Sequence, residues 1–185
     1  MARKRLERIL LIEIRGGGIR MKYTIRPIRE QDISFLWITL YESLYVPEGK
    51  ESFSREIINE PSILKYVEDW GREGDLGYIA ENADGESIGS ITVRYFSEDK
   101  RGYGFVSSEV PELGMAILPA YRSQGLGSAL MNQLFVGLSE QGIDRVSLSV
   151  DPGNEAAVKL YQRFGFKAVG EVGTSITMLA QVNRA

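Results

Sequence analysis

The chain has 185 residues, of which 43% are hydrophobic and 25% are charged, and its formal net charge is −3. This length and composition are typical of one soluble globular domain with a sizeable core, and the slight acidity gives no reason to expect a nucleic-acid partner. No apolar run approaches the ~18 residues that a membrane span needs, and the absence of cysteine and histidine excludes disulfides, thiolate nucleophiles, serine–histidine triads and most zinc sites.

The first twenty residues, MARKRLERILLIEIRGGGIR, differ in character from the rest, with six basic and two acidic residues. Glu7 and Glu13 interrupt the apolar run, so the segment does not match a secretory signal peptide, and we expect a cytoplasmic protein. Met21 follows directly. We interpret residues 1–20 as an extension, either translated from upstream of a true start at Met21 or forming a short helix or strand that docks on the domain of residues 21–185.

The first half of the domain changes from strand to helix and back to strand. Residues 22–28 alternate as a strand, and the spacing of apolar residues over 33–44 predicts a helix with Asp32 as its cap. Two short helices are expected at 53–59 and 62–70, broken at Pro61. Strands are predicted at 76–82 and 87–97, joined at the hairpin signal Asp84-Gly85, and at 112–118, where Pro119 ends the strand.

The second half predicts a strand–helix–strand crossover followed by closing strands. A helix is expected over 127–142, closed by Gly142, and a buried strand over 145–150. A helix over 154–164 begins at the cap Asn154 and ends at Gly165, and strands follow at 167–172 and 176–182. The pattern therefore predicts one mixed α/β domain of the α+β kind.

The stretch RSQGLGSALM, residues 122–131, places two glycines where a helix begins. Glycine weakens a helix by roughly 1 kcal/mol relative to alanine. The first N–H groups of a helix have no partner within it and favour an anion, and glycines let phosphate oxygens reach them. With Arg122 as a cation, the turn is shaped for a phosphate or pyrophosphate, although a tight packing turn would use the same residues. The Gly-Lys-Ser/Thr of a P-loop and the third glycine of a dinucleotide fingerprint are both absent.

Two linked motifs resemble the GNAT superfamily of acyl-CoA N-acyltransferases. LGMAILPAYRSQGLGSALM is similar to the family's Gln/Arg-x-x-Gly-x-Gly/Ala motif, and VSLSVDPGNEAAVKLYQRFGF is similar to the segment that follows it. The matching residues are Arg122, Gly125, Gly127, Asn154, Tyr161, Gly165 and Phe166. The resemblance covers nearly the whole chain after Met21. It implies the GNAT fold, with a mixed and mostly antiparallel sheet, a splayed central strand pair and flanking helices.

The resemblance also implies the residues that bind acetyl-CoA, the acyl donor. The pyrophosphate would lie on the turn formed by Arg122, Ser123, Gln124, Gly125, Leu126, Gly127 and Ser128. The backbone of Ile117 and Leu118 would pair with the pantetheine amides, and Asn154 would hydrogen-bond the pantetheine arm while also capping its helix. Gln124 stands where relatives often carry Arg or Lys, which would weaken affinity without altering the backbone cradle. No metal site is expected.

Acetyl transfer needs a neutral amine, whereas a lysine-type amine has a pKa of about 10.4 and is charged at neutral pH. Because the chain has no cysteine, a cysteinyl acyl-enzyme is impossible, and direct attack in a ternary complex is the simplest route. By resemblance, Tyr161 is the candidate general acid for the CoA sulfur, with a core aromatic as the alternative. Glu112 is the candidate base, acting through water, and Glu109 is close enough to compete; a solvated loop carboxylate is the alternative for each.

The sequence says little about the site that binds the acetyl acceptor. Residues 30–75 hold eleven acidic and four basic residues, and an acidic rim would attract a cationic amine. The predicted function is transfer of an acetyl group from acetyl-CoA to a primary amine of a small molecule or protein, with no nucleic-acid or membrane partner and with a homodimer left open. The alternative is a non-catalytic acyl-CoA-binding module. A protein outside the family that binds a phosphate-containing ligand would account for the glycine turn but not for residues 154–166.

Overall fold

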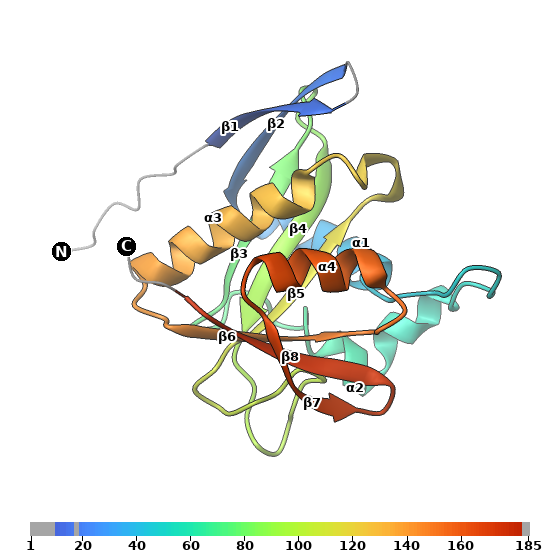
Figure 1. The fold of residues 1–185 in the computed structure, drawn as a ribbon, viewed down its shortest axis with the longest axis vertical. Coiled ribbons are helices and arrows are strands. Elements are labelled where there is room, and N and C mark those ends of the chain that lie inside the picture. The colour runs from blue at the N-terminus through green and yellow to red at the C-terminus, as the bar shows by residue number, and fades with distance from the viewer. Residues whose placement is uncertain (1–9, 17–18, 183–185) are drawn as a thin grey trace.

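The alternating segments of the sequence form the strands of one mixed sheet in the computed structural model, which describes residues 10–16 and 19–182. The strands are β1 (Leu10–Gly16), β2 (Ile19–Pro27), β3 (Leu76–Glu81), β4 (Ser87–Arg94), β5 (Glu112–Ile117), β6 (Arg145–Val150), β7 (Lys167–Val172) and β8 (Ser175–Gln181). Their order across the sheet is β1-β2-β3-β4-β5-β6-β8-β7 (Figure 1). Every neighbouring pair is antiparallel except β5 and β6, which confirms the predicted mixed and mostly antiparallel sheet.

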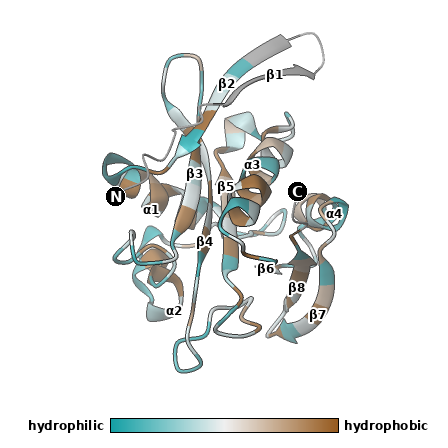
Figure 2. Cartoon of the chain, turned by 90° about the vertical axis from the view of Figure 1, so that its left-hand side faces the viewer, coloured by the Kyte–Doolittle hydropathy of each residue, from teal (hydrophilic) through white to brown (hydrophobic). Residues whose placement is uncertain are grey.

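Helices cover both faces of the sheet. Figure 2 shows α1 (Ile33–Glu42) and α2 (Pro61–Leu64) on one side and α3 (Leu126–Glu140) and α4 (Glu155–Arg163) on the other. Short 3-10 turns complete the order at Glu30–Asp32, Arg55–Asn59 and Pro119–Tyr121. Within the described residues, no helix has the length and apolar character that crossing a membrane requires.

Two apolar cores hold the helices to the sheet. The larger core lies under α3, where Leu130, Leu134 and Leu138 are fully buried, and it extends to α4. The smaller core lies under α1 and centres on Leu36 and Ile79. This burial follows the spacing of apolar residues in the sequence, because residues three and four apart share one face of a helix.

The helix expected over residues 62–70 ends early, at Leu64. The cause is Arg94 of β4, whose Nη1 donates to the carbonyl oxygens of Lys65 and Glu68 at 2.8 and 2.7 Å. A helix would need carbonyls of this stretch for its own hydrogen bonds, so tertiary contacts replace the second half of the predicted helix with turns.

Asp32 precedes α1 as expected, but its side chain makes no cap hydrogen bond to that helix. Its carboxylate instead accepts from Nη1 and Nη2 of Arg26 at 2.6 and 2.9 Å and from the Arg29 N–H at 2.7 Å. Arg26 is only 4% exposed and also pairs with Glu81. A buried guanidinium needs such anionic partners, so the expected cap serves as the counter-ion that ties β2 to β3 and α1.

The sheet opens in its middle, between β5 and β6. These strands pair at only two positions, Glu112 with Ser147 and Leu113 with Leu148. Beyond Leu113 no further pair joins these two described strands, although β5 continues to Ile117 and β6 to Val150. This is the splayed central pair that was predicted, and the turn into α3 follows directly from its open end.

The outer edge of the sheet includes part of the first twenty residues. Leu10–Gly16 forms β1, which pairs with β2 from Leu10 opposite Ile25 to Gly16 opposite Ile19. In Figure 1 this hairpin extends beyond the rest of the sheet. A native start at Met21 stays a prediction.

Candidate active site

The glycine turn is shaped by two residues with left-handed backbone. Ser123 has φ 59° and Gly125, the N-cap of α3, has φ 83°. A left-handed conformation costs a non-glycine residue roughly 1–2 kcal/mol, which explains the glycine at position 125. The next residue, Leu126, is 2% exposed and anchors the helix start in the core. The turn therefore has a fixed shape.

The start of α3 leaves backbone donors uncapped. Leu126, Gly127 and Ser128 form its first turn, and among the described residues no side chain caps it. Such N–H groups, together with the helix dipole, form an anion site. A Cβ on Gly127 would lie 3.1 Å from Leu160 Cδ2 and 3.6 Å from Ile117 Cδ1. Gly127 therefore also permits close packing of α3 on α4, a structural role alongside its predicted binding role.

Two polar side chains of the turn, those of Arg122 and Gln124, are engaged within the protein. Arg122 donates from Nε to the Ile117 carbonyl at 2.8 Å and from Nη2 to Glu42 Oε2 at 3.0 Å. Gln124 Nε2 donates to the Ala120 carbonyl at 3.0 Å. The cation predicted for phosphate binding is thus paired with Glu42 of α1.

The backbone groups of β5 point alternately toward β4 and toward the gap beside β6. Leu118 donates its N–H to the Ile88 carbonyl at 2.9 Å, and its own carbonyl accepts from the Tyr121 N–H at 2.9 Å. Both of its backbone groups are therefore engaged inside the protein. Because successive residues of a strand direct their backbone groups to opposite sides, Met115 and Ile117 face the gap toward β6. Sequence alone gave the strand but not which of its residues face the gap.

Asn154 lies across this gap, at the start of α4. Its Oδ1 accepts from the Ala157 N–H at 3.2 Å, so it caps the helix as predicted. Beside it, the Tyr45 hydroxyl donates to the Gly153 carbonyl at 2.9 Å. That bond ties the loop after α1 to the loop before α4.

Glu112 begins β5 and is 4% exposed. Its Oε1 accepts from the Tyr66 hydroxyl at 2.7 Å and from the Gly104 N–H at 2.8 Å. Its Oε2 is buried and has no hydrogen-bond partner among the described residues. Burial raises the pKa of this carboxyl, although the two hydrogen bonds act against it. Glu109, the competing candidate, is exposed and lies in the preceding turn.

Tyr161 is buried on α4, with its ring centroid 5.7 Å from that of Phe166. Burial raises the pKa of its phenol to about 12, so the hydroxyl keeps its proton at neutral pH. Tyr161 belongs to the core under α3, whereas Glu112 contacts Tyr66 on the side of α2. The structure thus places the two candidates on opposite faces of the sheet, on either side of the strand pair that opens.

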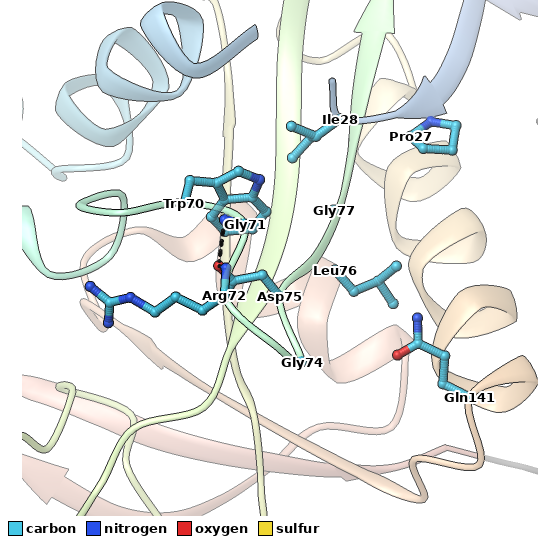
Figure 3. A pocket seen from close by; sticks show the side chains of 10 residues that line it. All are labelled: Pro27, Ile28, Trp70, Gly71, Arg72, Gly74, Asp75, Leu76, Gly77 and Gln141. Atoms are coloured by element: carbon cyan, nitrogen blue, oxygen red, sulfur yellow. Dashed lines mark hydrogen bonds between the residues drawn. The ribbon is translucent and has the colours of Figure 1, made fainter. Parts of the chain in front are cut away.

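A cavity of about 370 Å³ lies beside the C-terminal end of α3, at Gln141, and Figure 3 shows its lining. Its lining residues are Pro27, Ile28, Trp70, Gly71, Arg72, Gly74, Asp75, Leu76, Gly77 and Gln141. Gln141 follows the C-terminus of α3, about 20 Å from the helix start by the rise of 1.5 Å per residue. Arg72 points out of the cavity and Asp75 accepts from the Gly71 N–H. None of these residues belongs to the predicted site.

Comparison with known proteins identifies the family. A model of the acetyltransferase (GNAT) family matches residues 37–166, which include the glycine turn, the splayed strands and α4. The chain belongs to the GNAT family. The resemblance inferred from the two motifs is therefore confirmed, and acetyltransferase activity is the family's property.

Relatives of this GNAT protein differ in what they acetylate. Mycothiol acetyltransferase of Paenarthrobacter aurescens (strain TC1) is 39% identical over 101 residues, covering 54% of this chain and 29% of that protein. A Bacillus subtilis (strain 168) protein, provisionally assigned as a ribosomal protein bS18-alanine N-acetyltransferase, is 26% identical over 152 residues, covering 82% and 85%. The chain spans under a third of the mycothiol enzyme's length. Among solved structures, the GNAT domain of S. lividans PAT superposes with a TM-score of 0.65 at 17% identity, covering 94% and 96%, and shares the fold.

Sequence reasoning missed the partners of Glu112. Tyr66 lies in a segment where the sequence predicts a helix, and no contact with Glu112 is predicted for Gly102 or Gly104. Two glycines around one aromatic residue, in RGYGF, indicate a backbone that approaches another group closely. That pattern indicates a close backbone contact, but which group this backbone contacts depends on the fold.

Proposed function

We propose that this GNAT family member transfers an acetyl group from acetyl-CoA to a primary amine of a small molecule or protein. The observation that carries the proposal is the uncapped start of α3 directly beside the open edge of β5. An anion site followed by a free strand edge is the arrangement that a pyrophosphate with an amide-bearing arm requires.

The proposed donor site uses mainly backbone groups. The N–H groups from Ser123 to Ser128 would hold the pyrophosphate, and Gly125 keeps that cradle free of a side chain. The backbone of Met115 and the Ile117 N–H offer the open edge to the pantetheine amides, in place of the pair Ile117 and Leu118, because the Ile117 carbonyl already accepts from Arg122 Nε. Because Asn154 uses Oδ1 for capping, its amide NH₂ remains to donate to the pantetheine arm.

In the proposed reaction, the amine nitrogen attacks the thioester carbonyl. A C–N bond forms and the C–S bond breaks. The proton lost by the amine passes through water to Glu112, and the CoA sulfur takes a proton from Tyr161. The raised pKa of each residue supports its role, because Glu112 becomes a stronger base and Tyr161 stays protonated.

Release of CoA thiol, followed with a thiol reagent, tests this function. The chain has no cysteine, so every thiol that appears comes from CoA. Because the relatives named above include an alanine N-acetyltransferase, the amine panel comprises a peptide with N-terminal alanine, free amino acids and a polyamine. Amine-dependent thiol release with an acetylated product of matching mass is expected. Thiol release at the same rate with and without an amine would contradict the proposal.

The alternative, a non-catalytic acyl-CoA-binding module, is favoured by one observation. Glu112 is 4% exposed and lies beneath the loop that contains Gly104. In that case acetyl-CoA would stabilise the fold while no amine in the panel is acetylated.

A further inference from the structure

Glu112 is held by partners on one of its two carboxyl oxygens. Oε1 accepts both the Tyr66 hydroxyl and the Gly104 N–H, whereas Oε2 has no partner in the described structure. The Tyr66 oxygen itself accepts the Tyr103 N–H at 2.7 Å. Because that N–H approaches the phenol oxygen as a donor, the phenol proton is the one that is directed to Glu112.

Two glycines bring the loop backbone onto this pair. A Cβ on Gly102 would overlap Glu112 Oε2, and a Cβ on Gly104 would overlap the backbone of Leu148 in β6. Glycine is therefore needed at both positions for the loop to lie against the carboxyl and the strand beside it. The close approach shows that the loop is fitted to Glu112 and does not merely pass over it.

Tyr66 is fixed in three ways. Arg94 holds the backbone on either side of it through the carbonyls of Lys65 and Glu68, and Arg94 is itself paired with buried Asp75 at 2.6 Å. The Tyr66 ring packs edge-on against Phe96, with centroids 5.0 Å apart. The third constraint is the pair of hydrogen bonds at the hydroxyl.

We propose that Tyr66 is a positioning residue for Glu112. Its hydroxyl and the Gly104 N–H together saturate Oε1, which leaves Oε2 as the oxygen that takes up the proton. This inference rests on the proposed function, in which Glu112 is the base. Tyr66 touches neither the amine nor the thioester in this scheme. It acts on the reaction through the direction and basicity of the carboxyl.

Few other polar groups face Glu112 from the elements packed around it. Lys65, next to Tyr66, favours the ionised carboxyl. On β4 the residue opposite is Arg94, whose charge is paired with Asp75. On β6 it is Ser147, whose buried Oγ also has no partner among the described residues. The Tyr66 hydroxyl is thus the side-chain donor to this carboxyl among the described hydrogen bonds.

The direction of the expected pKa change follows from these contacts. Burial raises the pKa of Glu112, and the hydrogen bond from Tyr66 lowers it. Removing the hydroxyl therefore raises the pKa of Glu112 further. Because a base works only when it is ionised, the ascending limb of the activity–pH profile moves to higher pH, and each unit of that movement is a tenfold loss of rate at a fixed pH on the limb.

Tyr66→Phe tests the proposal, because it keeps the ring on Phe96 and removes only the hydroxyl. Tyr95→Phe is the matched control, since that phenol faces Asp144 and not Glu112. The side-chain carboxyl of Glu112 is titrated by ¹³C NMR, with its signal assigned from Glu112→Gln, and the pH profile of kcat/KM is measured in parallel. We expect the carboxyl pKa and the ascending limb to rise in Tyr66→Phe, with both unchanged in Tyr95→Phe and with near-normal rates at high pH.

An unchanged Glu112 titration in folded Tyr66→Phe overturns the proposal, as does a rate loss that is equal at every pH. If Tyr66→Phe does not fold, the Tyr66 Cζ signal is titrated in the wild type and in Glu112→Gln. Burial raises the pKa of Tyr66 most, and the Glu112 charge raises it further. That pKa must therefore fall in Glu112→Gln, and an unchanged value overturns the proposal. The NMR result stands without turnover, so a chain that acetylates no amine would refute the proposed function while the titration still decides the role of Tyr66.

Discussion

Desolvation raises the pKa of both Glu112 and Tyr161, but the two shifts have different consequences for catalysis. In the proposed reaction, the raised carboxyl pKa would move the base Glu112 toward the pH at which it must work. The raised phenol pKa, about 12, keeps the acid form fully populated at neutral pH. As the proposed acid, Tyr161 would therefore contribute no descending limb to the activity–pH profile near neutrality, and a loss of rate at moderately alkaline pH would have another source.

The Tyr161 hydroxyl is tested by Tyr161→Phe. We expect turnover to fall by roughly 10²–10⁴-fold, the usual contribution of a positioned general acid, while acetyl-CoA affinity stays near that of the wild type. The ring and its contact with Phe166 remain, so stability should change little. Steady-state turnover and calorimetric affinity separate the two effects. Equal turnover, with chemistry shown to limit the rate, would leave Tyr161 as a core aromatic.

A glycine with left-handed backbone lies at each end of α3, but the two glycines have different expected roles. Gly125 has φ 83° at the start of the helix and Gly142 has φ 72° just after its last turn. Nothing lies within 4 Å of a Cβ built on Gly142. A substitution at either glycine meets the same backbone strain, so a difference between the two variants reports on the ligand.

Gly125→Val and Gly142→Val are therefore a matched pair. We expect each to lose roughly 1–2 kcal/mol or more of unfolding free energy, because a β-branched residue is strained in left-handed backbone. Acetyl-CoA affinity should be lost in Gly125→Val alone, since its side chain would occupy the cradle. Denaturant titration and calorimetry give the two quantities. Equal affinities in the two folded variants would return Gly125 to a purely conformational role.

The start of α4 allows capping and binding to be separated at one residue. Asn154→Asp keeps an oxygen that accepts from the Ala157 N–H but removes the amide NH₂. We expect stability to be retained, because Asn and Asp cap helices equally well, while acetyl-CoA binding weakens. Asn154→Ala should lose affinity and also about 1 kcal/mol of stability. Unaltered acetyl-CoA affinity in Asn154→Asp would make Asn154 a cap alone.

The alternating strands, the glycine turn and the linked motif around Asn154 were enough to predict most strands of the sheet and the resemblance to the GNAT family. These patterns are local or recur at fixed spacing, so the sequence encodes them directly. The splay was predicted only because the resemblance implies it. The contacts that reach between distant segments could not be predicted. Arg94 lies 29 residues from the Lys65 carbonyl it captures, and Tyr66 lies 46 residues from Glu112. The spacing of apolar residues around Lys65 and Tyr66 does not indicate a contact with Arg94 or Glu112. The contact of Arg94 with the Lys65 carbonyl is the one that ends α2 early.

The fold also bears on a start at Met21, because β1 is not a neighbour of the candidate site in the sheet. Strands β3 and β4 separate β2 from β5. Without β1, β2 would still pair with β3 from Thr24 to Pro27, and Arg26 would keep its buried partners Asp32 and Glu81. The contacts that hold β2 to the domain are thus independent of the segment before Met21.

We therefore predict that a chain beginning at Met21 folds and binds acetyl-CoA as the full chain does. At 100 times the dissociation constant, ligand should add about 2.7 kcal/mol to the unfolding free energy, which raises the melting temperature of a domain this size by roughly 5–10 °C. Calorimetric melting of both chains, with and without acetyl-CoA, measures that rise. Because the proposed ligand contacts lie at β5, α3 and α4, the rise should be equal even if loss of β1 lowers the melting temperature of the shorter chain. A shorter chain that does not fold, or that folds without the rise, would make residues 1–20 part of the functional domain, and N-terminal sequencing of the native protein shows which of the two chains exists.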